Sequence, residues 1–222
     1  MDIQPKKSLG QNFLINPHIL DKIVFSAEIT KNDTVIEVGP GTGNLTRKLA
    51  EQAKRVITIE KDHRLIELLR SDFNNLRNID NVEIIEGDVL DTAMIPIVER
   101  WASSQYKIVA NIPYYITSNF LRTLFEKWPT PKLIVLTIQK EVAQRIVAKP
   151  PHMNLLALSV QYYSEPKIIG YISRNNFHPI PKIDSAIIRL NPHHHRHPSN
   201  DHDAHGKKLF ELMRAGFSEK RK

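Results

Sequence analysis

Cysteine is absent from the 222 residues, so the chain can form neither a disulfide framework nor a cysteine-ligated zinc site. This composition suits a reducing compartment. The first residues lack the apolar run of a secretory signal, and no later run approaches the ~20 apolar residues that span a bilayer. The sequence therefore predicts a cytoplasmic protein without a membrane partner, long enough for one main core. We expect it to act as a monomer.

Glycine is also scarce, with only 8 residues, yet three of them stand at Gly39, Gly41 and Gly43. They end a β-branched run, 34–38, and precede a helical pattern. Glycine permits positive φ and lets a ligand approach the backbone, while the following helix offers free N–H groups. Many strand-to-helix turns use glycines only to reverse the chain. A second β-branched run that ends at Glu60 favours a ligand, because a carboxylate there can accept both hydroxyls of a ribose.

The spacing of the glycines narrows the choice of ligand. The pattern is G-x-G-x-G, and Asn44 and Leu45 stand where a dinucleotide-binding G-x-G-x-x-G turn would place its third glycine. A pyrophosphate-binding NAD site is therefore disfavoured. A nucleoside without phosphates fits better, and S-adenosylmethionine is the common ligand of that description.

Strand and helix patterns alternate through the first two thirds of the chain. The expected strands are 34–38, 55–60, 82–86, 106–111 and 132–138, and the expected helices are 43–52, 62–75, 92–102, 117–128 and 139–148. Such alternation predicts an α/β fold with a doubly wound, mostly parallel sheet. Before it, Asn16 caps a helix with Pro17 at its first position, and the apolar repeat of this helix predicts an amphipathic lid or brace.

Two further groups follow strands at the same edge of the predicted sheet. Asp88 comes after the third strand and can accept a hydrogen bond from the amine of an adenine, although an acidic residue there is often only a turn former. The segment Asn111-Ile-Pro-Tyr114 ends the fourth strand. Pro113 bars Ile112 from helical geometry, so the Asn111 side chain and nearby carbonyls can converge on one amino group. Tyr114 can stack on the ring that bears it. Without the nucleoside site, a proline-directed turn would be the better explanation.

The net charge of +7 is unevenly divided along the chain. Residues 32–138 carry 13 Lys and Arg against 14 Asp and Glu, whereas 139–190 carry 7 against 3 and 206–222 carry 6 against 2. A basic balance often serves solubility alone. A basic second half beside a neutral ligand-binding half favours a polyanionic substrate such as RNA.

The segment Asn111-Ile-Pro-Tyr114 resembles the amino-methyltransferase motif in the form typical of ribosomal RNA adenine N6,N6-dimethyltransferases. Five more segments are similar to that family's patterns, in its order: Lys7-Ser-Leu-Gly-Gln-Asn-Phe-Leu14, Glu37-Val-Gly-Pro-Gly-Thr-Gly43, Gln139-Lys-Glu-Val142, Phe177-His-Pro-Ile-Pro-Lys-Ile-Asp-Ser185 and Phe217-Ser-Glu-Lys-Arg-Lys222. The resemblance covers nearly the whole chain. Gln161-Tyr-Tyr163, the Pro-Lys-Ile-Asp-Ser run and the terminal segment are similar to the small-subunit (KsgA) branch rather than to the antibiotic-resistance (Erm) branch.

The resemblance implies a class I S-adenosylmethionine-dependent methyltransferase fold and a role for each matched residue. Cofactor binding would rest on Asn12, Leu14, Gly39, Gly41, Glu60, Asp88 and Asn111. Resemblance alone places Asn12 and Leu14 at the cofactor's edge, and it places Gly39 at the methionine side. Catalysis would rest on Asn111, Ile112, Pro113, Tyr114 and Phe177. Phe177 would cover the face of the flipped base opposite Tyr114. The implied partner is ribosomal RNA or a small-subunit precursor.

The sequence also predicts three parts: a methyltransferase domain at 1–190, a linker at 191–205, and the beginning of a truncated helical C-terminal domain at 206–222. Six of the ten histidines lie in the linker, at His193, His194, His195, His197, His202 and His205. They lack helical spacing and an apolar frame, so we expect no metal site. One departure from the family is Leu155-Leu-Ala-Leu-Ser159, where relatives commonly have an aromatic-Gly-Arg-Leu-Ser run.

The expected mechanism follows from the adenine amine, whose lone pair is delocalised into the ring. Acceptors at Asn111 and at the Ile112 and Pro113 carbonyls would hold its hydrogens and aim a pyramidal nitrogen at the methyl group. Neither a metal nor a general base is required. Three alternatives stay open: an NAD oxidoreductase, which gives Asn111-Ile-Pro-Tyr114 no role; a non-catalytic RNA-binding ribosome-assembly factor; and an Erm-like enzyme for large-subunit RNA.

Overall fold

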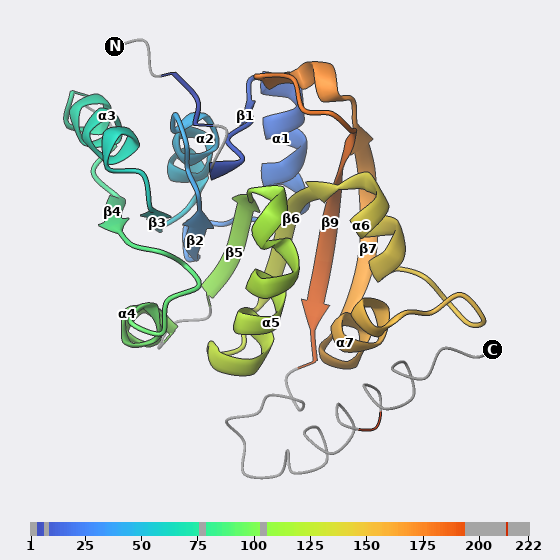
Figure 1. The fold of residues 1–222 in the computed structure, drawn as a ribbon. Coiled ribbons are helices and arrows are strands. Elements are labelled where there is room, and N and C mark those ends of the chain that lie inside the picture. The colour runs from blue at the N-terminus through green and yellow to red at the C-terminus, as the bar shows by residue number, and fades with distance from the viewer. Residues whose placement is uncertain (1–3, 7–8, 76–78, 103–105, 194–211, 213–222) are drawn as a thin grey trace.

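A computed structural model describes residues 4–6, 9–75, 79–102, 106–193 and 212 (Figure 1). The strands are β1 Phe13–Leu14, β2 Thr34–Val38, β3 Arg55–Glu60, β4 Val82–Glu86, β5 Tyr106–Asn111, β6 Leu133–Gln139, β7 Ser164–Ile172, β8 Phe177–His178 and β9 Ser185–Pro192. The helices are α1 Pro17–Ser26, α2 Asn44–Gln52, α3 His63–Asn74, α4 Met94–Ala102, α5 Thr117–Lys127, α6 Lys140–Ile146 and α7 Leu155–Tyr163. Two short 3-10 turns, η2 Tyr114–Ile116 and η3 Arg174–Asn176, precede α5 and β8.

Seven strands form the central sheet in the order β4-β3-β2-β5-β6-β9-β7. All pairs from β4 to β6 are parallel, and β9 runs antiparallel to both of its neighbours. The predicted α/β class and mostly parallel sheet are therefore confirmed. The carboxyl ends of β2, β3 and β5 meet at the upper edge of the sheet in Figure 1, where an open α/β fold holds its ligand.

Helices cover both faces of the sheet, as apolar residues on each face require. One core cluster joins the sheet to α4, α5, α6 and α7, and it contains Phe120, Leu124 and the fully buried Trp128. The other cluster joins the opposite face to α1 and α2. α3 packs beside α2, where Arg47 forms an ion pair of 2.8 Å with Asp72.

The start of α1 has the predicted cap. The Asn16 side chain accepts hydrogen bonds from the backbone N–H groups of His18 and Ile19, and Pro17 occupies the first helical turn. Leu20, Ile23 and Val24 are buried in the second core cluster. α1 therefore braces the sheet as one of its covering layers.

The alternation of patterns predicted the first half well. Strands 34–38, 55–60, 82–86 and 106–111 have the predicted bounds, and the helices and β6 differ by at most two residues at either end. The sequence did not predict α7, nor the return of the chain through β9 between β6 and β7. β9 ends at Pro192, two residues beyond the predicted domain boundary at 190. The linker beyond residue 193, and all of 206–222 except Leu212, lie outside the described residues.

Candidate active site

One open cavity lies at the upper edge of the sheet, with an empty volume of about 1000 Å³ when its mouth is included. Its lining comes from the N-terminal segment 9–14, the glycine turn and the loops that follow β3, β4 and β5. Ten predicted site residues line it: Asn12, Leu14, Gly39, Gly41, Glu60, Asp88, Asn111, Ile112, Pro113 and Tyr114. Phe177 does not. The structure therefore brings together residues nearly a hundred positions apart in the sequence.

The glycine turn has the left-handed backbone that its sequence predicts. The φ angles of Gly39, Gly41 and Gly43 are +65°, +60° and +79°. A Cβ at Gly41 would lie 2.8 Å from the ring of Phe13, so this glycine also admits the N-terminal segment over the turn. Gly43 is the N-cap of α2, whose first N–H groups lack a side-chain cap. The turn thus offers bare backbone to a ligand.

Glu60 stands at the end of β3, almost wholly buried. One carboxylate oxygen accepts the backbone N–H groups of Lys61 and Asp62, both at 2.8 Å, and the other accepts that of Gly41 at 3.4 Å. Burial raises the pKa of Glu60, and the three N–H groups partly offset that rise. The carboxylate is thus held rigidly, with lone pairs left for hydroxyl donors in the cavity.

Glu37 is a second buried carboxyl in this cavity, and the sequence suggested no role for it. It is the penultimate residue of β2, two residues before Gly39, and its Oε2 accepts a hydrogen bond of 2.6 Å from the Thr46 hydroxyl on α2. Burial raises the pKa of Glu37 to about 8, and the nearby charge of Glu60 adds to the rise. Two acidic groups in one apolar pocket favour a cationic ligand, because a positive charge would stabilise both ionised forms.

Asp88 follows β4 at the same edge. Its Oδ2 accepts a bond of 2.7 Å from the Lys61 ammonium, and its Oδ1 accepts the Leu90 N–H at 3.0 Å. Burial raises the pKa of Asp88, but the bond from Lys61, the Leu90 N–H and the positive charge of Lys61 together outweigh it, so the net shift is downward. Asp88 is therefore an ionised acceptor that caps its own turn, as the turn interpretation expects. Its contact with an adenine amine stays a prediction.

Asn111 ends β5 and reaches the N-terminal segment. Its side-chain Nδ2 donates to the backbone carbonyl of Asn12 at 3.2 Å. Because the nitrogen is engaged there, the amide oxygen is the atom left to accept a donor in the cavity. Asn44 makes a similar bond, from Nδ2 to the Leu14 carbonyl, at 3.2 Å. The segment 9–14 thus fixes the orientation of Asn111.

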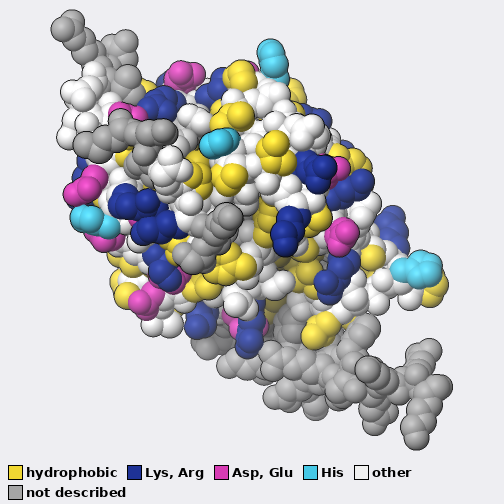
Figure 2. Space-filling model, turned by 45° about the horizontal axis from the view of Figure 1, so that its top comes forward, with side chains coloured by type: hydrophobic (Ala, Val, Ile, Leu, Met, Phe, Trp, Pro, Cys, Tyr) yellow, Lys and Arg dark blue, Asp and Glu magenta, His cyan; other side chains and the backbone are white. Residues whose placement is uncertain are grey.

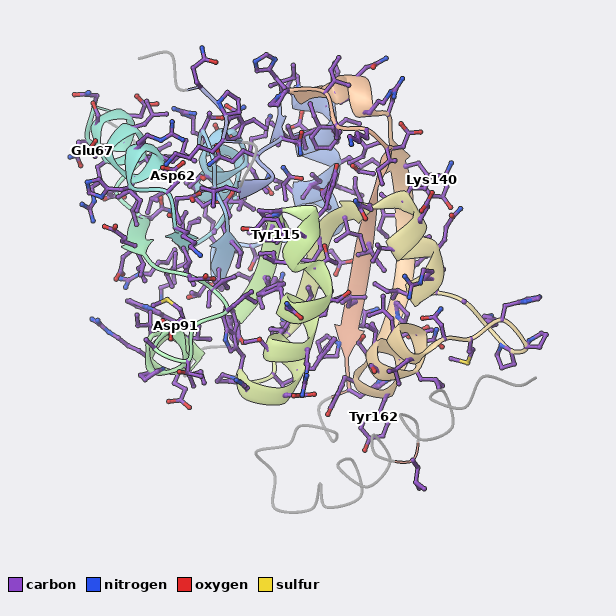
Figure 3. The ribbon with its side chains drawn as sticks, viewed as in Figure 1. Asp62, Glu67, Asp91, Tyr115, Lys140 and Tyr162 are labelled. Atoms are coloured by element: carbon purple, nitrogen blue, oxygen red, sulfur yellow. The ribbon has the colours of Figure 1, made fainter. Side chains whose placement is uncertain are left out.

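Two adjacent tyrosines follow Pro113 in different environments. Tyr114 is half-buried, and its hydroxyl lies 2.6 Å from the Ser185 hydroxyl at the start of β9. Tyr115 is 58% exposed, with its ring beside Gly10 at the cavity rim. Figure 3 shows Tyr115 by the upper end of α5, well above Tyr162 at the lower end of the fold. Tyr114 is therefore the tyrosine suited to a defined ring position.

The structure does not bring Phe177 into the cavity. Phe177 lies in β8, which pairs with β1 so that Phe177 faces Leu14 in the register. Its side chain is only 1% exposed and belongs to the core cluster beneath α1. To stack on a base it would have to turn out of that core, so its base-stacking role stays a prediction.

Asp62 is a site residue that the sequence did not reveal. Its buried carboxylate accepts bonds of 2.9 Å from Gln11 Nε2 and 2.6 Å from Arg64 Nη2, and it pairs with Lys6 Nζ at 3.4 Å. The bond from Arg64 holds the pKa of Asp62 well below its usual range. A charge fixed at the start of α3 therefore fastens the N-terminal segment beside Glu60.

The upper face around the cavity carries cations and apolar side chains together. Figure 2 shows Lys and Arg spread over this face among hydrophobic groups. Lys140, near the upper edge in Figure 3, has its ammonium 5.2 Å from the ring centre of Tyr171, which is 53% exposed. Such a mixture suits a single-stranded nucleic acid.

Within the described residues there is no group of three or more His, Asp or Glu placed to hold a metal ion, and no helix long and apolar enough to cross a membrane.

Comparison with known proteins gives a consistent result. The family model described as "Ribosomal RNA adenine dimethylase" matches residues 3–222. The chain is 42% identical over 220 residues to the small-subunit ribosomal RNA methyltransferase A of Lachnoclostridium phytofermentans, covering 98% of this chain and 74% of that protein. It is also 42% identical over 221 residues to the protein of the same name from Bacillus pumilus, with 98% and 74% covered.

Two solved structures share the fold at appreciable identity. A dimethyladenosine transferase from Plasmodium falciparum superposes with a TM-score of 0.80 at 35% identity, covering 95% of this chain and 72% of that one. The 23S rRNA methyltransferase ErmE superposes with a TM-score of 0.75 at 30% identity, covering 92% and 80%. Each superposition thus covers more than nine tenths of this chain.

Proposed function

Because the chain belongs to the ribosomal RNA adenine dimethylase family and has its S-adenosylmethionine-dependent methyltransferase fold, we propose that it dimethylates the N6 amine of adenosines in small-subunit ribosomal RNA. The observation that carries the proposal is the placement of the Asn111 amide in the same cavity as the glycine turn and Glu60. A precursor of the small ribosomal subunit is then the partner. A cytoplasmic location and a monomeric state remain predictions.

The cavity suits S-adenosylmethionine in shape and charge. When bound, this cofactor supplies a methyl group activated on a positively charged sulfur. Glu60 would accept the ribose hydroxyls, and Asp88 would accept the adenine amine. Gly39 and Gly41 would let the methionine part approach the backbone, with Asn12 and Leu14 at its edge. The ionised forms of Glu37 and Glu60 would balance the positive charge.

Methyl transfer also requires an amine with an available lone pair. The Asn111 oxygen, with the carbonyls of Ile112 and Pro113, would accept the amine hydrogens and weaken the conjugation of nitrogen with the ring. Tyr114 would stack on the base once it leaves its helix, a contact worth about 1–3 kcal/mol. Positioning of the amine provides the main rate gain, and the proton is released after transfer.

The choice of small-subunit RNA is supported by the two relatives at 42% identity that carry that name. ErmE, which acts on 23S rRNA by its title, is less similar at 30% identity. The cavity residues alone do not separate these substrates, because the same chemistry applies to both RNAs. The discrimination would therefore depend on the surface outside the cavity.

The test is methyl transfer from methyl-labelled S-adenosylmethionine to each ribosomal RNA and to assembling subunits. We expect label in small-subunit RNA, recovered as N6,N6-dimethyladenosine after digestion. Label confined to large-subunit RNA would favour an Erm-like enzyme. RNA binding without any methyl transfer would favour the alternative of a non-catalytic ribosome-assembly factor.

A further inference from the structure

Ser185 stands outside the cavity lining, yet it touches a residue that lines it. Its side chain is fully buried at the start of β9, and its hydroxyl lies 2.6 Å from that of Tyr114. The two residues are 71 positions apart: Tyr114 begins the turn η2 that follows β5, and Ser185 begins β9. This contact is the direct hydroxyl link between the antiparallel strand and the Asn-Ile-Pro-Tyr segment.

The backbone of Ser185 is a rigid anchor. Ser185 faces Gln139 of β6 on one side and Ile172 of β7 on the other, so it is held in the sheet between two strands. The preceding residue is fixed as well: the Asp184 carbonyl accepts the Lys140 N–H, and the Asp184 carboxylate accepts the Arg174 N–H, both at 3.0 Å. An anchor paired on both sides moves little.

Tyr114 has less support of its own. It begins the three-residue turn η2, whose N-cap, Pro113, provides no side-chain bond. A tyrosine side chain has two rotatable torsions, so fixing its hydroxyl also fixes the direction of the ring. Because Ser185 does not line the cavity, this bond directs the hydroxyl out of the cavity and leaves the ring at its wall.

We propose that Ser185 is a positioning residue for methyl transfer: its hydrogen bond to Tyr114 holds the ring in the orientation that presents its face to the target base. The inference rests on the proposed function, because it concerns the base that is methylated. Ser185 itself touches neither base nor cofactor. It acts through Tyr114.

The same contact also argues against the Tyr114 hydroxyl as the group that accepts a proton from the amine. Burial raises the pKa of the Tyr114 hydroxyl, and the bond from Ser185 only partly offsets that rise. A neutral phenol engaged with a buried serine is a poor proton acceptor for the amine. Tyr114 therefore contributes a stacking surface, and the polar contacts to the amine fall to Asn111.

The test is a double-mutant cycle on methyl transfer with Ser185→Ala, Tyr114→Phe and the double variant. The measurements are kcat, KM for small-subunit RNA and the Kd for S-adenosylmethionine. We expect each single variant to lower kcat about tenfold with an unchanged cofactor Kd, since a small misplacement of the base is costly. The double variant should lose no more than either single one, because both remove the same bond.

Two matched variants test whether the loss of any buried hydroxyl group, rather than of this particular hydrogen bond, lowers kcat. Ser164→Ala removes a fully buried serine hydroxyl that donates to the Val160 carbonyl, and Tyr106→Phe removes a buried phenol that donates to the Pro129 carbonyl. Both residues lie outside the cavity lining, so their kcat should match the wild type. Thermal unfolding of all variants shows whether a loss of kcat follows a loss of fold.

Additive losses, or an unchanged kcat in Ser185→Ala, would overturn the inference. Should Ser185→Ala fail to fold, Tyr114→Phe decides alone, because it keeps the ring and removes only the hydroxyl; a wild-type kcat in that variant overturns the inference too. Failure of the proposed function gives a different result, namely no adenine methylation by the wild type under any of these conditions.

Discussion

The two halves of the central sheet differ in construction and in what they give to the site. The cofactor half, β4-β3-β2-β5, is wholly parallel, and its loops, with the segment 9–14, supply nearly all of the cavity lining. The outer half, β6-β9-β7, contains both antiparallel pairs and meets the cavity residues through Ser185 and the pairing of β8 with β1.

This difference follows from strand direction. Parallel strands end at one edge, so their loops converge there and build a ligand site. An antiparallel strand begins at that edge instead. β7 brings the chain to the edge, the segment 173–184 lies there, and β9 leads the chain away from it. In the function proposed above, the cofactor half would bind S-adenosylmethionine and the outer half would support the residues that face the target base. Each prediction below separates these two contributions.

The largest expected effect comes from Asn111, where the halves meet. Asn111→Ala should lower methyl transfer at least ~10²-fold, because the reacting amine loses the acceptor that orients it. Cofactor affinity, measured by calorimetry, should remain largely intact. Asn81→Ala is the matched control: the Asn81 side chain donates to the Ala50 and Ala53 carbonyls and lies outside the cavity lining, so this variant should keep its transfer rate. Normal transfer by Asn111→Ala would make the segment structural.

The next effect should be confined to the cofactor half. Glu60→Ala should weaken S-adenosylmethionine binding by about 1–3 kcal/mol, since the ribose hydroxyls lose a charged acceptor. Glu86→Ala is a matched control, because Glu86 pairs with Glu60 across the β3–β4 register but is exposed and outside the cavity. Titration calorimetry measures both variants. Equal affinities for Glu60→Ala and Glu86→Ala would contradict the ribose assignment.

The same contrast explains how much the sequence predicted. In the cofactor half, every strand is a β-branched run that ends at a glycine, an acid or an amide, so periodicity and edge position together located Gly39, Glu60, Asp88 and Asn111 in one cavity. The rule that parallel strands share a ligand-binding edge was sufficient there. Comparison with known proteins confirmed the family, while the individual roles of these residues stay predictions.

The outer half was less predictable because its features depend on pairing across the fold. β9 is apolar enough to lie anywhere in the sheet, and nothing in its sequence specifies insertion between β6 and β7. Phe177 matched a family pattern, but strand alternation in β8 turns its ring toward the core. Asp62 and Ser185 act through Gln11 and Tyr114, contacts separated by 51 and 71 positions, which no local pattern reveals.

The pH dependence of the free energy of unfolding gives a third test, again within the cofactor half. The pKa of Glu37 is raised to about 8 from 4.5, so between these values the folded chain holds a proton that the unfolded chain releases. Its free energy of unfolding should therefore fall as pH rises through this window, by at most ~1.4 kcal/mol per pH unit. Glu37→Gln should flatten the slope, with a remainder from Glu60, whose pKa is also raised. Urea unfolding at several pH values measures it, and the exposed Glu51→Gln is the control. An unchanged slope in Glu37→Gln would show that Glu37 is already ionised.

The smallest expected effect is on the salt dependence of RNA affinity, and it follows from the different net charges of the two halves. Residues 139–190 carry 7 Lys and Arg against 3 Asp and Glu, whereas 32–138 carry 13 against 14. For each tenfold rise in salt concentration, the logarithm of the RNA association constant should fall by ~0.7 for every phosphate contact. Cofactor affinity should barely respond to salt.

Lys140 directly follows β6 and Lys182 precedes β9, so both stand at the edge of the sheet where the cavity opens. Lys140→Gln with Lys182→Gln should reduce that salt slope by up to ~1.4 if each lysine meets one phosphate. Lys54→Gln with Lys127→Gln removes the same charge from the turn before β3 and the end of α5. Both lysines lie toward the edge of the sheet where the parallel strands begin, opposite the cavity, so this pair should leave the slope unchanged. Titration of small-subunit RNA at three salt concentrations measures both pairs. Equal slopes for the two pairs would mean that RNA senses only the total charge of the chain, and the outer half would then have no separate role in holding the substrate.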